Sequence, residues 1–78
     1  MIIKTRHDAG DFVWMHERGT MYHGMIKEVT TRMDENLERP VIQYLISEDV
    51  GRIALIDESE VYKTQRGCRI AAEKWKER

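Results

Sequence analysis

Two runs of aromatic and β-branched residues, punctuated by glycines, most constrain how this chain folds. A turn-forming Gly-Asp pair at residues 10–11 directly precedes Phe-Val-Trp at 12–14, side chains that suit a pleated, half-buried surface. Residues 16–20 are polar and include a glycine, which can take the positive φ that a short hairpin connection needs. The sequence therefore predicts a β-hairpin with strands at about 11–15 and 21–29, joined by a turn at 16–20.

Gly24 interrupts the second of these strands. An isolated glycine inside a strand indicates a β-bulge or a close approach of another backbone segment. Beyond it, Ile26 and Val29 do not keep strict alternation, and a bulge would explain that slip. We therefore expect the strand to bend near residue 24, as strands do at the corner of a small barrel.

The middle of the chain predicts a second hairpin. A polar run at residues 30–39 is typical of an exposed loop, and Pro40 suits the first position of the next strand, where its missing N–H costs least. Residues 41–47 carry apolar side chains on both faces and should form a central strand. A polar turn at 48–52 then leads to a further strand at 53–56.

Two short segments are less determined. Residues 57–60 are acidic, and residues 61–63, Val-Tyr-Lys, suit either a fifth strand or a single helical turn that closes the barrel. The sequence does not separate these two alternatives. Residues 1–9 begin with an apolar pair and then turn polar, and they stay unassigned.

The C-terminal segment predicts an amphipathic helix. Thr64 suits the N-cap, and the helix should cover residues 65–76. Gly67 in its first turn lowers helix stability by up to about 1 kcal/mol relative to alanine. We expect the burial of Trp75 to offset that loss. The side chains spaced to form a narrow apolar stripe against the barrel are Cys68, Ala71, Ala72 and Trp75.

Several of these motifs resemble a known superfold of small barrels. Gly10-Asp11-x-Val13, then Gly19 and Gly24-Met25-Ile26-x-x-Val29, is similar to the opening of KOW-like and Tudor-like modules, which are Src-homology-3-like barrels. More loosely, Tyr44-Leu45-Ile46, Glu60-Val61-Tyr62 and the Thr64-capped helix resemble short barrel proteins of bacteria and phages. The resemblance implies a mainly β fold, a small five-stranded Src-homology-3-like open barrel with a short C-terminal α-helix. A KOW-like barrel would imply nucleic-acid or ribosome-associated binding, and a Tudor-like barrel a cage for a modified side chain.

Composition limits the classes of function. Residues 1–78 suffice for one small domain. Thirteen basic and fourteen acidic residues give a formal charge of -1, so the chain lacks the field of a strong, sequence-independent nucleic-acid binder, although a local basic patch stays open. A single cysteine cannot form an intramolecular disulfide, which favours a reducing, cytoplasmic setting. No apolar run has the length of a signal peptide or a membrane span, so we expect neither export nor a membrane partner.

No catalytic or metal-binding pattern stands out. His7, His16, His23 and Cys68 are the soft-ligand candidates, and the histidine spacings match no pair that zinc sites use. Cys68 lies on the apolar stripe of the helix, which favours a packed thiol. The acidic run at 57–60 is typical of a solvated loop. We therefore predict no enzyme activity, no metal and no cofactor.

The aromatic residues suggest a binding surface instead. Trp14, Tyr22, Tyr44 and Tyr62 come from four candidate strands and could gather on one rim of a barrel to stack bases or hold a cationic or proline-rich ligand. Tyr44 suits the core better, and the side of Trp14 is left open. Arg18 adds positive charge near the first hairpin, among acidic neighbours. The candidate ligand-binding residues are Trp14, Tyr22, Tyr62 and Arg18.

Two functions follow from this pattern. The first is a small non-enzymatic interaction module that binds a protein partner, or itself as a homo-oligomer, through a barrel edge or the aromatic rim. The second is a nucleic-acid-associated KOW-like barrel that uses Trp14 or Tyr22 as stacking platforms.

Overall fold

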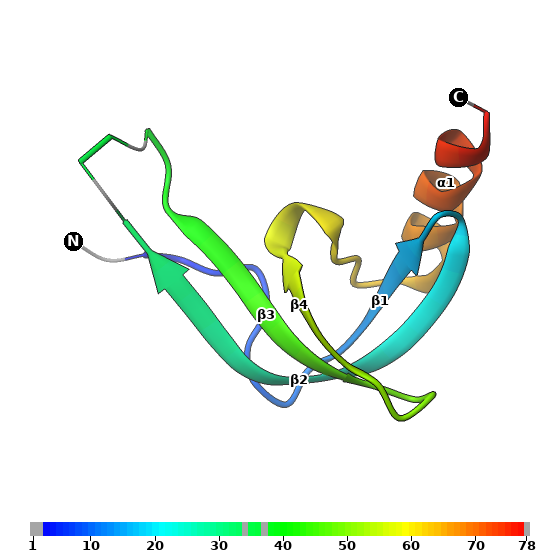
Figure 1. The fold of residues 1–78 in the computed structure, drawn as a ribbon, viewed down its shortest axis with the longest axis horizontal. Coiled ribbons are helices and arrows are strands. Elements are labelled where there is room, and N and C mark those ends of the chain that lie inside the picture. Colours follow the sequence, from blue (N-terminus) through cyan, green and yellow to red (C-terminus); the bar gives the residue numbers. More distant parts are fainter. Residues whose placement is uncertain (1–2, 34, 37, 78) are drawn as a thin grey trace.

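The computed structural model describes residues 3–33, 35–36 and 38–77 and shows a mainly β fold. Four antiparallel strands form one unclosed sheet in the order β1-β2-β3-β4, and a helix follows, as Figure 1 shows. These strands and the C-terminal helix confirm the mainly β prediction. The bounds are β1 Phe12–Glu17, β2 Thr20–Arg32, β3 Val41–Glu48, β4 Ile53–Asp57, a 3-10 turn η1 Glu58–Glu60 and α1 Gln65–Lys76.

The turn between β1 and β2 is shorter than predicted. Arg18 and Gly19 have φ values of 52° and 84°, and the cross-strand pair Glu17–Thr20 flanks them. Two successive residues with positive φ make the tight connection whose twist matches that of the flanking strands. The five-residue turn predicted at 16–20 is therefore wrong, because the polar residues at its ends extend the strands.

β2 is long and bends sharply (Figure 1), and the bend has two local causes. The pairing with β3 shifts between Ile26 and Glu28, so the bulge lies at Lys27 and explains the slip in alternation. The bulge is thus three residues beyond the position predicted for the bend. Gly24 serves the other predicted purpose, a close backbone approach: a Cβ there would overlap the carbonyl oxygen of Ser47 and lie 2.9 Å from the Cα of Glu48.

The core lies on one face of the bent sheet, which we call the inner face. Alternation places the intervening side chains on the opposite, outer face. β3 lies between β2 and β4, and its even-numbered residues are buried, so the prediction of a central strand is confirmed. The buried core residues are Val13, Met15, Ile26, Ile42, Tyr44, Ile46 and Val61.

Residues 61–63, which follow the 3-10 turn η1, form neither a fifth strand nor a helical turn. Asp57 accepts a hydrogen bond from the backbone N–H of Ser59 and caps η1. Tyr62 then makes a single antiparallel bridge with Trp14, whose two N–H···O bonds measure 2.7 and 2.8 Å. Because η1 ends at Glu60 and Thr64 already caps α1, only one residue has room to pair. The predicted five-stranded barrel is therefore not confirmed: the sheet has four strands among the described residues.

α1 begins as predicted, with the Thr64 hydroxyl accepting from the N–H of Gly67 at 3.1 Å. The helix packs against β1 and β2, and Cys68 and Ala72 are the buried residues of its stripe. Trp75 is 44% exposed. Trp75 is thus only partly buried, beside His16 and Tyr62, and the stabilisation expected from its burial stays a prediction.

The N-terminal segment, which the sequence left unassigned, packs against the core. His7 is buried, and its backbone N–H donates to the hydroxyl of Tyr44, while Ile3 packs against the core. The unassigned N-terminal segment thus covers part of the inner face.

The loop after β2 is shorter than predicted. β2 continues to Arg32, so the loop predicted at 30–39 starts at residue 33; its residues 34 and 37 lie outside the described residues.

Candidate interaction surface

The structure separates the residues predicted to share one aromatic rim. The backbone bridge brings Trp14 and Tyr62 together at the free edge of β1. Tyr22 pairs with the buried residue Met15 across the hairpin and so lies on the inner face. Arg18 occupies the tight turn. Tyr44 is fully buried, as expected of a core residue.

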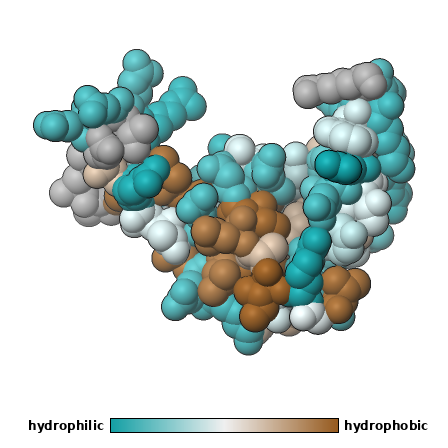
Figure 2. Space-filling view, in the orientation of Figure 1, coloured by the Kyte–Doolittle hydropathy of each residue, from teal (hydrophilic) through white to brown (hydrophobic). Residues whose placement is uncertain are grey.

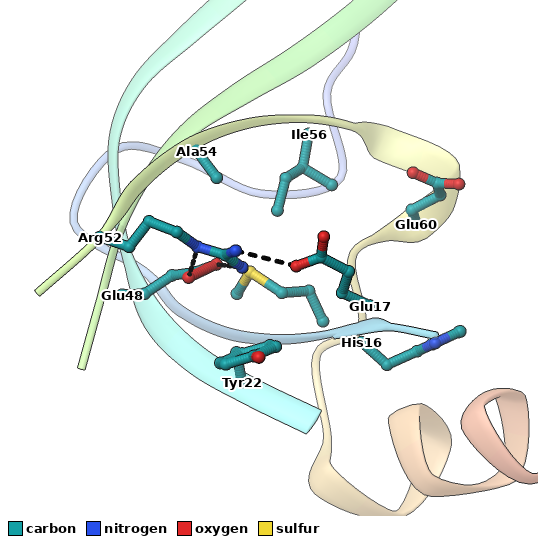
Figure 3. A pocket seen from close by; sticks show the side chains of 9 residues that line it. His16, Glu17, Tyr22, Glu48, Arg52, Ala54, Ile56 and Glu60 are labelled. Atoms are coloured by element: carbon teal, nitrogen blue, oxygen red, sulfur yellow. Dashed lines mark hydrogen bonds and ion pairs between the residues drawn. The ribbon is translucent and has the colours of Figure 1, made fainter. Parts of the chain in front are cut away.

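An arginine and three carboxylates, those of Glu17, Glu48 and Glu60, line a cavity on the inner face (Figure 3). Arg52 donates through Nε and Nη2 to the two carboxylate oxygens of Glu48, at 2.6 and 3.1 Å, and through Nη1 to Glu17 at 2.8 Å. Its guanidinium carbon lies 4.8 Å from the centre of the Tyr22 ring. The hydrogen bonds to Glu48, and then to Glu17, raise the pKa of Arg52. These contacts connect the β3–β4 turn to β1.

Three of the charged side chains that line the cavity, those of Arg52, Glu48 and Glu17, are already paired with one another. The volume of the cavity is about 270 Å³. The side chain of Glu48 is fully buried, so the bidentate contact with Arg52 supplies the partner that a buried carboxylate requires. Its other wall is apolar, with Met15, Ala54 and Ile56. We interpret this site as a structural ion-pair network.

A second polar network lies at the other end of the inner face. The hydroxyl of Tyr44 donates to Glu58 at 2.6 Å and accepts from the N–H of His7 at 3.2 Å. The N–H of Arg6 donates to the same Glu58 oxygen at 2.9 Å. Burial, and secondly the bond to Glu58, raise the pKa of Tyr44 to about 12. This network fixes the N-terminal segment and η1 against β3.

Other side chains give little support for a catalytic or metal-binding site. Cys68 is buried, and burial raises the pKa of its thiol, which lowers its reactivity. Within the described ranges, no three His, Cys, Asp or Glu side chains gather in a way that could hold a metal ion. In the same ranges, no helix has both the length and the apolar character that crossing a bilayer requires.

The outer face, by contrast, carries exposed apolar residues toward both edges of the sheet. Phe12 faces Met25 across β1 and β2, and Leu45 faces Leu55 across β3 and β4. Between these pairs, Met25 faces Ser47 and Leu45 faces Glu28. Phe12 and Ile53 are each 65% exposed, and Leu55 is 55% exposed. Figure 2 shows hydrophobic residues gathered over β4 and around the β3–β4 turn. We call the set Phe12, Met25, Leu45, Ile53 and Leu55 the outer apolar surface.

The surface ends at an open strand edge. Among the residues that the structure describes, β3 is the only strand that pairs with β4. The N–H of Glu48 donates to the carbonyl of Arg52 at 2.7 Å, and bonded pairs alternate along an antiparallel ladder. Ala54 and Ile56 therefore bond to β3, whereas the N–H and C=O groups of the exposed residues Ile53 and Leu55 point away from the sheet.

The opposite edge of the sheet, on β1, is covered in part. Tyr62 pairs with Trp14 in the middle of β1, and α1 packs beside it. Edge strands of monomeric proteins usually carry lysine, proline or a bulge that discourages pairing. β4, with the sequence Ile-Ala-Leu-Ile-Asp, has no lysine, proline or bulge, and its protection is limited to its shortness and the exposed Asp57 at its end. The sequence predicted a barrel edge as the binding surface without choosing between the two edges.

A short aromatic row lies at the β1 end of the outer face. The rings of Phe12 and His23 stack at 6.1 Å with an angle of 18°, and Trp14 lies 5.0 Å from His23 on its other side. A surface depression beside Phe12 is lined in part by Arg6 and Lys63. This row holds one of the predicted site residues, Trp14, with two partners that sequence reasoning missed.

Comparison with protein-family models gives no match, and comparisons with curated proteins and with solved structures give none either.

Proposed function

We propose that the protein is a small, non-enzymatic interaction module that associates with a second copy of itself through the open edge of β4. The observation that carries the proposal is an edge strand with outward backbone groups and two exposed aliphatic side chains, Ile53 and Leu55, and with no lysine, proline or bulge. Strand addition at such an edge is a common mode of protein recognition.

The predicted open barrel fits this proposal. The 3-10 turn after β4 and the bridge between Tyr62 and Trp14 support a curled sheet in which a fifth strand is reduced to one residue. In such a barrel, β1 is the edge that the chain covers, and β4 is the edge left for a partner.

The size of the edge limits the strength of association. β4 has five residues, and each new backbone hydrogen bond contributes about 0.5–1.5 kcal/mol net. The loss of translational and rotational freedom costs at least about 4 kcal/mol. We therefore expect a weak, reversible dimer, with a dissociation constant on the order of 10 μM to 1 mM.

Sedimentation velocity over that concentration range tests the proposal. The wild type should shift from monomer to dimer, and Leu55→Lys should remain monomeric. Ile70→Lys is the matched control, because it places the same charge on an exposed aliphatic position of α1, away from the edge. A wild type that stays monomeric throughout, or a Leu55→Lys variant that dimerises like the wild type, contradicts the proposal.

The aromatic row supports a second candidate function, binding of single-stranded nucleic acid. Phe12 could stack a base, and Arg6 and Lys63 lie where a phosphate could be contacted. A titration of labelled single-stranded DNA at low salt decides the matter. Phe12→Ala should weaken binding by about tenfold, since base stacking contributes about 1–3 kcal/mol, and Ile70→Ala should not. Absence of binding by the wild type at low salt eliminates this candidate.

A further inference from the structure

The structure also indicates how the two copies are arranged. We propose that β4 of one copy pairs antiparallel with β4 of the other about a twofold axis at Leu55, so that Leu55 faces Leu55 and Ile53 faces Asp57. This inference rests on the proposed function and adds the orientation and register of the partner.

The alternation along β4 between residues bonded to β3 and residues whose backbone groups point outward sets the position of the twofold axis. Arg52, Ala54 and Ile56 bond to β3, and the alternate residues point their N–H and C=O groups outward. Leu55 is the middle residue of the five and belongs to the outward set. With the axis there, every outward residue of one copy meets an outward residue of the other, and each such pair can exchange both N–H···O bonds.

The distribution of charge sets the orientation. The C-terminal end of β4 is acidic: Asp57 is followed by Glu58 and Glu60. The backbone N–H of Ser59, followed by its hydroxyl, lowers the pKa of Asp57, which therefore stays ionised. Arg52 directly precedes the other end, and its charge is already paired with the carboxylates of Glu48 and Glu17. Antiparallel pairing separates the two acidic ends, because it places Asp57 of one copy beside Ile53 of the other, whereas parallel pairing in register would place the acidic ends together.

The side chains of the outer face complete the match. Ile53, Leu55 and Asp57 lie on this face of β4 and are all exposed. On the axis, the two Leu55 side chains contact each other and shield apolar area from water. The Leu45–Leu55 pairs of the two copies then lie next to each other across the joined sheets.

Two lysine substitutions on the same strand test the register. Leu55→Lys places two positive charges opposite each other and should weaken the dimer at least about tenfold. Ile53→Lys adds the same charge to the same face, but each lysine faces Asp57 of the other copy, so the dissociation constant should stay within about threefold of the wild type. The double variant Ile53→Lys with Asp57→Lys should lose the dimer again.

Disulfide cross-linking of single cysteine variants gives a second test of the register, and this test does not depend on small changes in affinity. Leu55→Cys should form a disulfide between copies on mild oxidation, because residues directly opposite in such a pair have Cα atoms about 5.5 Å apart. Ile53→Cys should not, because its two copies lie on opposite sides of the axis. The wild type, with Cys68 buried, serves as the background.

The outcomes separate the two proposals. Cross-linking at residue 55 alone, with Ile53→Lys still dimeric, supports the antiparallel register. Cross-linking at both positions, or equal loss of dimer with both lysine variants, overturns the register but leaves β4 as the interface. A wild type that never dimerises overturns the register and the proposed function together.

Discussion

At the residue scale, the fold depends on polar side chains whose buried groups all find partners. Tyr44 and Glu48 carry the polar groups that β3 places on the inner face, and each lies in a network that reaches another segment of the chain. In the described part of the chain, no buried side-chain nitrogen or oxygen lacks a hydrogen-bond partner. Such networks bring distant segments together only while every member is satisfied.

Tyr44→Phe tests the network at the N-terminal segment. The change leaves the N–H of His7 without its partner and removes one of the two hydrogen bonds that Glu58 accepts, so it should lower the free energy of unfolding by about 1–3 kcal/mol at pH 7. Urea unfolding of both proteins measures the difference. Equal stability at pH 7 would show that the hydroxyl has no structural role.

The same pair of proteins gives a pH dependence with a defined sign. The pKa of Tyr44 rises from 10.0 to about 12 in the folded state, so folding favours the protonated hydroxyl. This stabilisation is complete below pH 10 and is lost as the pH rises from 10 to 12. Over that window the free energy of unfolding should fall by up to about 3 kcal/mol more for the wild type than for Tyr44→Phe, which has no hydroxyl to titrate at this position. A stability difference that does not change with pH would contradict this account.

At the scale of the elements, Gly24 allows β2 and β3 to approach at the bend of the sheet. Gly24→Ala would bring a Cβ against the backbone of Ser47 and Glu48, which cannot move as a side chain would. We expect a loss of about 1–3 kcal/mol in the free energy of unfolding. Lys27→Ala, on the same strand at the exposed bulge, is the control and should change stability by less than about 0.5 kcal/mol. Similar effects of the two changes would disprove the role of Gly24.

The elements also show what the sequence could predict. Local signals sufficed for the strands and for α1, because alternation and a Thr64 cap depend on near neighbours. Two errors came from the same source: a polar residue can extend a strand as well as form a turn, as His16 and Glu17 do. The exposure of Trp75 could not be foreseen, because it depends on how far the sheet extends beneath the helix.

The candidate site was less predictable than the fold. Bringing Trp14 and Tyr62 together requires a bridge between residues 48 positions apart in the chain. The separation of Tyr22 from that pair follows from the register of the first hairpin, which the predicted turn length had shifted. The contact of Arg52 with Glu17 likewise arises only once the sheet bends.

At the scale of the whole molecule, the two edges of the sheet are treated unequally. The chain covers β1 with Tyr62 and α1, and leaves β4 open beside exposed aliphatic side chains. A formal charge of -1 adds little repulsion between copies. The central claim is therefore that the open edge of β4 is where two copies meet.

Site-resolved amide hydrogen exchange on the wild type tests this claim most directly. As the protein concentration rises through the range of association, the amides of Ile53, Leu55 and Asp57 should exchange more slowly, because each gains a carbonyl partner from the other copy. The amides of Ala54 and Ile56, already bonded to β3, should change little. Exchange at residues 53, 55 and 57 that stays the same at every concentration would contradict the account.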